Sequence, residues 1–69
     1  MSTNHVWIFE LVIPGIGSIG LYGCHKSVER ELKHSKIFYD TKTAHGLEVE
    51  YSLGRLTVAR AIPKAVFIA

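Results

Sequence analysis

Apolar and polar residues alternate strictly in the last third of the chain. Between residues 47 and 53, an apolar side chain at each odd position is followed by Glu or Ser at the even position. This period of two predicts a strand with one buried and one solvated face. Gly54 and Arg55 then form a two-residue turn sequence with Gly first, so residues 56–62 are predicted to return as the second strand of a hairpin.

The pairing of this hairpin leaves one charged residue in an unfavourable place. Counted outward from the turn, Arg60 falls opposite Val49, on the apolar face. Either Arg60 snorkels at the rim of the sheet, or a β-bulge moves it to the other face, toward Glu48 and Glu50. Pro63 is expected to end the ladder or to mark an edge, because it has no N–H to donate.

A second hairpin is predicted in the first third of the chain. Residues 5–13 alternate between two mostly apolar faces, with Glu10 as the exception, which predicts a central strand covered on both sides. Pro14 and Gly15 are a strong type II turn signal, because Pro presets φ and Gly accepts a positive φ. Residues 18–23 can then run back as the partner strand.

One helix is predicted between the two hairpins, with Ser27 as its N-cap. Its only sizeable apolar residues are Val28 and Leu32, which make a narrow stripe. The helix is expected to end near Lys36. Residues 40–46 are polar and are predicted to be a link, and the apolar tail at residues 65–69 is expected to be extended and to need a pairing partner.

The whole chain, residues 1–69, is therefore predicted to be a single α+β domain, with residues 1–4 flexible. The expected architecture is a small antiparallel sheet with one helix packed on one face, in the order β-β-α-β-β. Such a thin helix cannot cover the apolar residues on both faces of the sheet. A leftover apolar face or edge usually marks an interface or a self-association surface.

Composition narrows the class of protein without naming a function. The chain is 48% hydrophobic and 20% charged, which favours a folded domain over a disordered one, and its net charge of +2 does not by itself imply a polyanionic partner. A single Cys excludes an internal disulfide framework and favours a cytoplasmic setting. The apolar run at residues 6–23 contains Glu10 and Pro14 and is preceded by no Lys or Arg, so neither a signal peptide nor a membrane span is predicted.

Residues 15–20 spell G-I-G-S-I-G, and Asp40 follows twenty residues later. The spelling resembles the dinucleotide-binding fingerprint, which implies phosphates at Gly15, Gly17 and Gly20 and a ribose at Asp40. The chain after Asp40 reads as a hairpin and not as further β-α units. Dinucleotide binding through Gly15–Gly20 is therefore kept only as a remote alternative, and no cofactor is predicted.

Four His and one Cys lack the paired spacing of a metal site, so no metal ligand is predicted. No general base is placed by sequence next to Cys24, and Cys24 is expected to be a small buried residue on the helix stripe. No catalytic residue is therefore predicted, and the chain is not expected to be an enzyme.

The favoured function is a protein-binding module acting through an apolar sheet face or edge, of the kind by which small phage or plasmid products inhibit or modulate a larger host protein. Self-association is the other expected use of such a face. The apolar residues expected to contact a partner are Trp7, Phe9, Phe67 and Ile68.

The alternative is a small nucleic-acid-binding regulator. Lys26, Arg30 and Lys33 lie on one side of the predicted helix, and Arg55, Arg60 and Lys64 of the last hairpin could assist them. Glu29 and Glu31 dilute this basic face, and no aromatic residue is interleaved with it in the sequence as a stacking platform. Protein binding is for this reason favoured over nucleic-acid binding.

Overall fold

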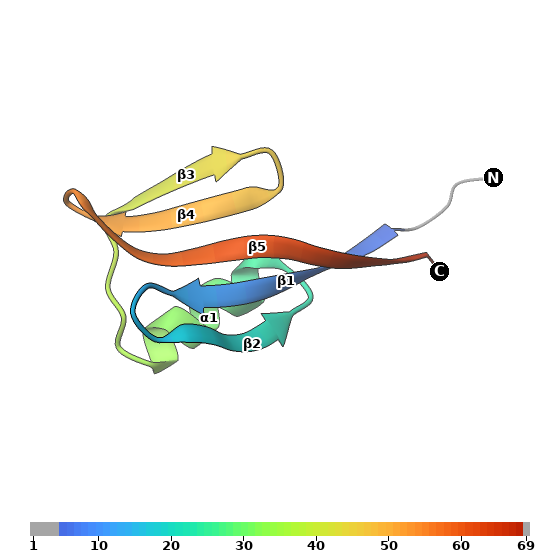
Figure 1. Ribbon diagram of the computed structural model, residues 1–69, viewed down its shortest axis with the longest axis horizontal. Coiled ribbons are helices and arrows are strands. Elements are labelled where there is room, and N and C mark those ends of the chain that lie inside the picture. Colours follow the sequence, from blue (N-terminus) through green and yellow to red (C-terminus); the bar gives the residue numbers. More distant parts are fainter. Residues whose placement is uncertain (1–4, 69) are drawn as a thin grey trace.

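Five antiparallel strands form one sheet in the order β2-β1-β5-β4-β3 (Figure 1). The computed structural model describes the backbone of residues 5–68 and the side chains of residues 6–66. The elements in chain order are β1 (His5–Ile13), β2 (Gly17–Tyr22), α1 (His25–His34), β3 (Thr41–His45), β4 (Glu48–Leu53) and β5 (Leu56–Ile68). The α+β class is confirmed, but the order is β-β-α-β-β-β, with one strand more than the sequence predicted.

The additional strand is β3, and the prediction of a polar link at residues 40–46 is wrong. β3 pairs with β4 without a register shift, from Thr41 opposite Ser52 to His45 opposite Glu48. Every residue of β3 is exposed. The strand is therefore held by its backbone ladder and has no buried face that could give it an apolar period.

The Pro14–Gly15 turn is confirmed as the connection between β1 and β2. The Ile16 N–H donates to the Ile13 carbonyl oxygen at 2.9 Å, and Gly15 has a φ of +85°, as a type II turn requires. β1 is a central strand, as predicted, but the prediction that it is covered on both sides is wrong. Helix α1 packs behind one face of the sheet only (Figure 1).

Of the two alternatives predicted for Arg60, the structure contains the β-bulge. β4 and β5 shift register between Tyr51 and Ser52, which places Arg60 opposite Glu50. Arg60 Nη2 then donates to Glu48 Oε2 at 2.7 Å. The bulge thus turns the guanidinium off the apolar face and gives it a carboxylate partner.

β5 does not end at Pro63. Its ladder with β4 stops at Ala61, as expected near a proline, but its ladder with β1 continues to Ile68. A second register shift allows the ladder between β5 and β1 to continue past Pro63, with Pro63 opposite Phe9 and Ala65 opposite Ile8. The apolar tail therefore finds its pairing partner in the start of the chain, except for residue 69, which lies outside the described residues.

The helix begins three residues earlier than an N-cap at Ser27 predicts. Cys24 is the N-cap, in an extended conformation and without a side-chain capping bond, and α1 starts at His25. Cys24 is exposed, so its predicted burial is wrong. The Ser27 side chain lies in the first turn, where its Oγ is 3.2 Å from the Cys24 Sγ. This contact with Ser27 lowers the pKa of the Cys24 thiol.

α1 ends close to the predicted position. The Ser35 N–H donates to the Glu31 carbonyl oxygen, and Lys36 takes a left-handed φ of +59°. The Ile37 N–H then returns to the Leu32 carbonyl oxygen at 2.8 Å. This C-terminal turn fixes how the chain leaves the helix and folds residues 37–39 back against it.

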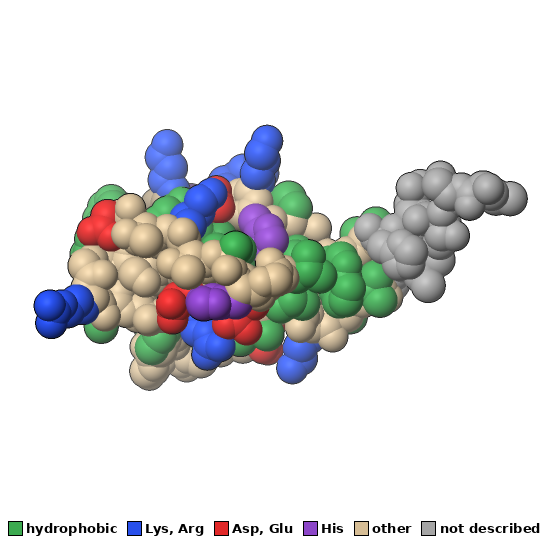
Figure 2. All heavy atoms as spheres, turned by 90° about the horizontal axis from the view of Figure 1, so that it is seen from above, with side chains coloured by type: hydrophobic (Ala, Val, Ile, Leu, Met, Phe, Trp, Pro, Cys, Tyr) green, Lys and Arg blue, Asp and Glu red, His purple; other side chains and the backbone are tan. Residues whose placement is uncertain are grey.

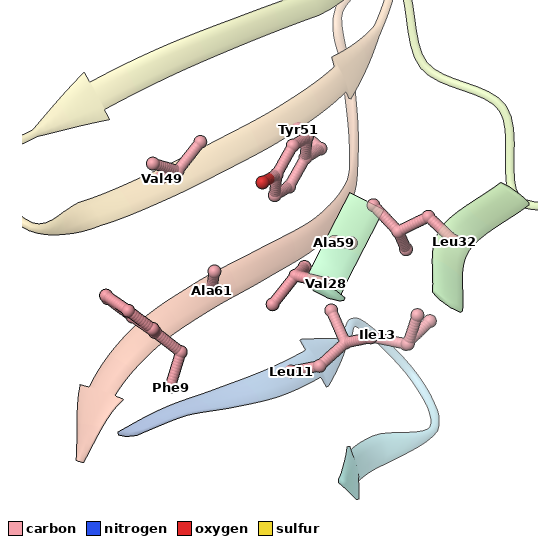
Figure 3. Close-up of a cluster of buried hydrophobic side chains, with 9 residues drawn as sticks. All are labelled: Phe9, Leu11, Ile13, Val28, Leu32, Val49, Tyr51, Ala59 and Ala61. Atoms are coloured by element: carbon pink, nitrogen blue, oxygen red, sulfur yellow. The ribbon is translucent and has the colours of Figure 1, made fainter. Parts of the chain in front are cut away.

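The core lies between α1 and one face of β1, β4 and β5. Its buried side chains are Phe9, Leu11, Ile13, Val28, Leu32, Val49, Tyr51, Ala59 and Ala61. Figure 3 shows Val28 and Leu32 of α1 lying between the side chains of β1 and those of β4. These two are the only buried residues of the helix, as the sequence predicted. α1 therefore makes limited packing contact with the sheet.

Two polar contacts reinforce this light packing. His25 Nε2 donates to the Leu47 carbonyl oxygen at 2.9 Å, and its ring centroid lies 4.2 Å from that of Phe9. The Tyr51 hydroxyl donates to Glu29 Oε2 at 3.1 Å. The first contact ties the start of α1 to the β3–β4 turn, and the second ties its middle to the core.

Asp40 joins the exit of the helix to the β4–β5 turn. Its carboxylate accepts hydrogen bonds from the Thr41 hydroxyl at 2.8 Å and from the Gly54 N–H at 3.1 Å. Its own N–H donates to the Ser52 carbonyl oxygen. The Thr41 bond first, and then the Gly54 bond, hold the pKa of this carboxyl below its usual value.

We expect Asp40→Asn to destabilise the fold at neutral pH and to matter less in acid. A lowered pKa in the folded state stabilises the fold above the pKa of the unfolded carboxyl, and this stabilisation is lost as the pH falls through the folded value. Urea unfolding at neutral pH and at about pH 2.5 tests this, because the gap between wild type and variant should shrink as the pH falls below the ordinary pKa of an Asp carboxyl. An equal gap at both pH values would contradict it.

Candidate functional site

Two surfaces stand out once the fold is in place, and the first is a two-stranded arm. The ladder between β1 and β2 begins at Phe9, and the ladder between β4 and β5 ends at Ala61. Beyond those points residues 5–8 of β1 pair only with residues 65–68 of β5. We call these two segments the arm. Figure 1 shows it projecting from the body of a molecule that measures 44 × 20 × 18 Å.

The arm exposes apolar side chains and open backbone edges. Val6 is 44% exposed, Trp7 36% and Val66 39%. Figure 2 shows hydrophobic side chains gathered on this part of the chain, next to the grey residues. Among the described residues, no third strand covers the outer edge of either arm segment. Unpaired strand edges are sites where another chain can add.

The sheet face opposite α1 continues one side of the arm, the side of Val6 and Ile8. Trp7 alternates with them, so Trp7 and its cross-strand neighbour Val66 lie on the other side of the arm. The open face opposite α1 carries the half-buried side chains of Ile8, Val12 and Ile62 and the 64% exposed side chain of Leu21. Side chains of successive strand residues point to opposite faces, so these positions face away from the core. Glu10 lies among them and pairs with Lys64, with Nζ 3.8 Å from Oε1.

The apolar residues predicted to contact a partner do not share one environment in the structure. Trp7 lies on the arm and is accessible. Phe9 is only 4% exposed, because its ring packs in the core against His25. The backbones of Phe67 and Ile68 pair with β1 in the arm, and their side chains lie outside the described residues.

The second surface is a shallow groove of about 460 Å³ on the outer side of α1. Its lining residues are Lys26, Glu29, Arg30, Lys33, Ile37, Phe38 and Tyr39. We call this the basic groove. The turn at Lys36 brings residues 37–39 beside the three cations of the helix, and the Phe38 side chain is 71% exposed. The structure thus places aromatic residues at the basic helix face, which the linear sequence did not predict.

Charge is distributed unevenly between the sheet and this groove. Three of the cations on the strands have carboxylate partners: Lys42 with Glu29, Arg60 with Glu48, and Lys64 with Glu10. Arg55 is exposed in the β4–β5 turn. No ion pair between described residues involves Lys26, Arg30 or Lys33. The groove therefore keeps its positive charges uncompensated.

Glu29 does not neutralise those charges, although it lines the groove. Its Oε2 accepts a hydrogen bond from Lys42 Nζ at 3.0 Å and another from the Tyr51 hydroxyl at 3.1 Å. Burial first, and then the Glu29 carboxylate, raise the pKa of Tyr51, so the hydroxyl stays protonated as a donor. The same carboxylate raises the pKa of Lys42. Glu29 is thus occupied by β3 and the core.

The glycine-rich segment serves the first hairpin and its packing. Gly15 and Gly17 take positive φ values at the turn. Gly20 lies within β2 opposite Leu11, where an added Cβ would come 2.9 Å from the Tyr22 hydroxyl oxygen. The dinucleotide fingerprint places a helix directly after these glycines, whereas residues 17–22 form β2.

No group of three His, Cys, Asp or Glu side chains within the described part of the chain is placed to hold a metal ion. In the same residues no helix is both long and apolar enough to cross a membrane.

The chain matches no protein-family model, no curated protein and no solved structure. The arm, the open face and the basic groove are therefore the features that indicate function.

Proposed function

We propose that the chain is a small, non-enzymatic protein-binding module that docks on a larger protein through the arm and the adjoining open face. The observation that carries the proposal is the arm itself, a two-stranded ribbon with apolar side chains exposed and both outer edges open. An isolated two-stranded ribbon is only marginally stable in water. A partner that covers the arm would bury its apolar residues and order it.

The arm suits two modes of contact at once. Its open edges offer backbone N–H and C=O groups to a strand of the partner, and its side chains offer apolar area. Val6, Trp7 and Val66 supply the exposed apolar groups, and Trp is a residue type that often dominates binding energy. A small chain that occupies a sheet edge or apolar cleft in this way can inhibit or modulate its target, as small phage and plasmid products do.

Val66→Asp tests the proposal in the full-length chain. The new carboxylate would have to be desolvated against an apolar partner, so affinity capture from the native cell extract should lose whatever protein the wild type retains. Added salt should change wild-type capture little, since the contact is apolar. Leu56→Asp is the matched control, because Leu56 is 66% exposed at the start of β5, away from the arm.

Two results would count against this function. One is a wild-type chain that stays monomeric and retains no partner. The other is a partner held equally well by wild type, Val66→Asp and Leu56→Asp. Light scattering on the purified chain separates a larger partner from a second copy of the chain, because only self-association raises the mass without extract.

A further inference from the structure

We propose that the basic groove binds single-stranded nucleic acid, with a base stacked on Phe38 and the phosphates contacted by Lys26, Arg30 and Lys33. This inference concerns the outer side of α1 and does not rest on the protein-binding function of the arm.

The three cations form one stripe along the helix. Lys26, Arg30 and Lys33 are separated by four and then three residues, and such positions lie on the same side of an α-helix. They extend over about 10 Å along the axis, at the usual rise per residue. The stripe is thus an extended row of positive charge, which suits a polyanion better than a single small anion.

The same cations are available to a ligand. The carboxylates near the helix are already engaged: Glu29 by Lys42 and Tyr51, and Glu31 by the Ser35 hydroxyl at 2.6 Å. Binding phosphates at the groove therefore requires no ion pair between described residues to be broken. Release of the counterions of the nucleic acid would favour the complex.

Phe38 supplies the feature that distinguishes a stacked base from a bare phosphate chain. Its side chain is 71% exposed, whereas its neighbours Ile37 and Tyr39 are half-buried and pack against the core. Tyr39 is further fixed by its edge-on contact with Tyr51, at a centroid distance of 4.8 Å. The ring of Phe38 is thus presented to solvent beside the cations by two anchored neighbours.

A single strand uses this combination more fully than a duplex does. Bases of a single strand are free to stack on an aromatic ring while the backbone follows positive charge, and such binding tolerates any sequence. The bases of a duplex are already stacked, so a duplex would use the cations but gain nothing from Phe38. A shallow groove lined by both kinds of group therefore favours single-stranded nucleic acid.

Fluorescence anisotropy with a labelled oligo(dT) tests the proposal on the full-length chain. The wild type should bind with a log–log salt slope of about −2, as three phosphate contacts to a single strand predict. Phe38→Ala should weaken binding about tenfold or more and leave the slope unchanged. Arg30→Ala should weaken binding and bring the slope about 0.7 closer to zero.

Arg55→Ala is the matched control. The sequence grouped Arg55 with the helix cations, but the structure places it in the β4–β5 turn and outside the lining of the groove, so its loss removes the same charge and should change neither affinity nor slope. Circular dichroism verifies that each variant is folded, and all three sites are exposed. The proposal is overturned if oligo(dT) does not bind, or if the duplex of the same length binds more tightly. It also fails if Phe38→Ala binds like the wild type or if an oligoglutamate peptide binds as tightly as oligo(dT).

Discussion

Leu32→Ala is expected to lower the free energy of unfolding by about 2–5 kcal/mol. Leu32 is fully buried and is one of only two buried residues of α1. The truncation removes apolar contacts and leaves a cavity between the helix and the sheet. With Val28 as the only remaining buried contact of the helix, α1 should detach before the sheet unfolds.

This loss is large relative to the total free energy of unfolding of a chain of this size. A domain of 69 residues is expected to be stable by only about 3–10 kcal/mol. Urea unfolding followed by far-ultraviolet circular dichroism measures the change, and Leu56→Ala is the matched control, because Leu56 is 66% exposed. We expect the control to stay within about 0.5 kcal/mol of wild type. Equal effects of the two substitutions would show that α1 is not held by its buried stripe.

Detachment of α1 would also allow the two proposed sites to be tested independently of each other. The basic groove is built on the helix, whereas the arm is built on β1 and β5. Leu32→Ala should therefore abolish oligo(dT) binding under conditions in which the arm still pairs. The light packing of the helix makes the groove the less stable of the two surfaces.

The sequence predicted the parts of the fold that local chemistry determines. Pro14 and Gly15 determine their turn by their own φ preferences. The alternation at residues 47–53 indicates directly which face of the strand is buried. The bulge near Arg60 was also foreseeable, because an apolar position for a guanidinium is unfavourable. Which of the two alternatives holds was decided by Glu48, which the bulge brings within 2.7 Å.

The parts that were missed depend on tertiary contacts. β3 has no buried residue, so nothing in residues 41–45 distinguishes a strand from a polar link. Cys24 matched the helix stripe by spacing, but as the N-cap it lies outside the helix and at the surface. The aromatic side of the basic groove depends on the left-handed turn at Lys36, a residue type that gives no signal for such a conformation.

Ala59→Leu is expected to lower the free energy of unfolding by about 1–3 kcal/mol through overpacking. Ala59 is fully buried in the central part of the sheet, opposite Tyr51 and in the same cluster as Val28 and Leu32. A larger side chain there must push α1 away from the sheet or force Tyr51 out of place. Displacement of Tyr51 would also break its hydrogen bond to Glu29.

The same substitution on the arm separates overpacking from a general effect on the strand. Ala65 lies on β5 as Ala59 does, but it is exposed. Ala65→Leu should therefore change stability by no more than about 0.5 kcal/mol. If Ala59→Leu is instead as stable as the wild type, the core has space for a larger side chain at this position. The close approach of α1 to the sheet would then not depend on a small residue at position 59.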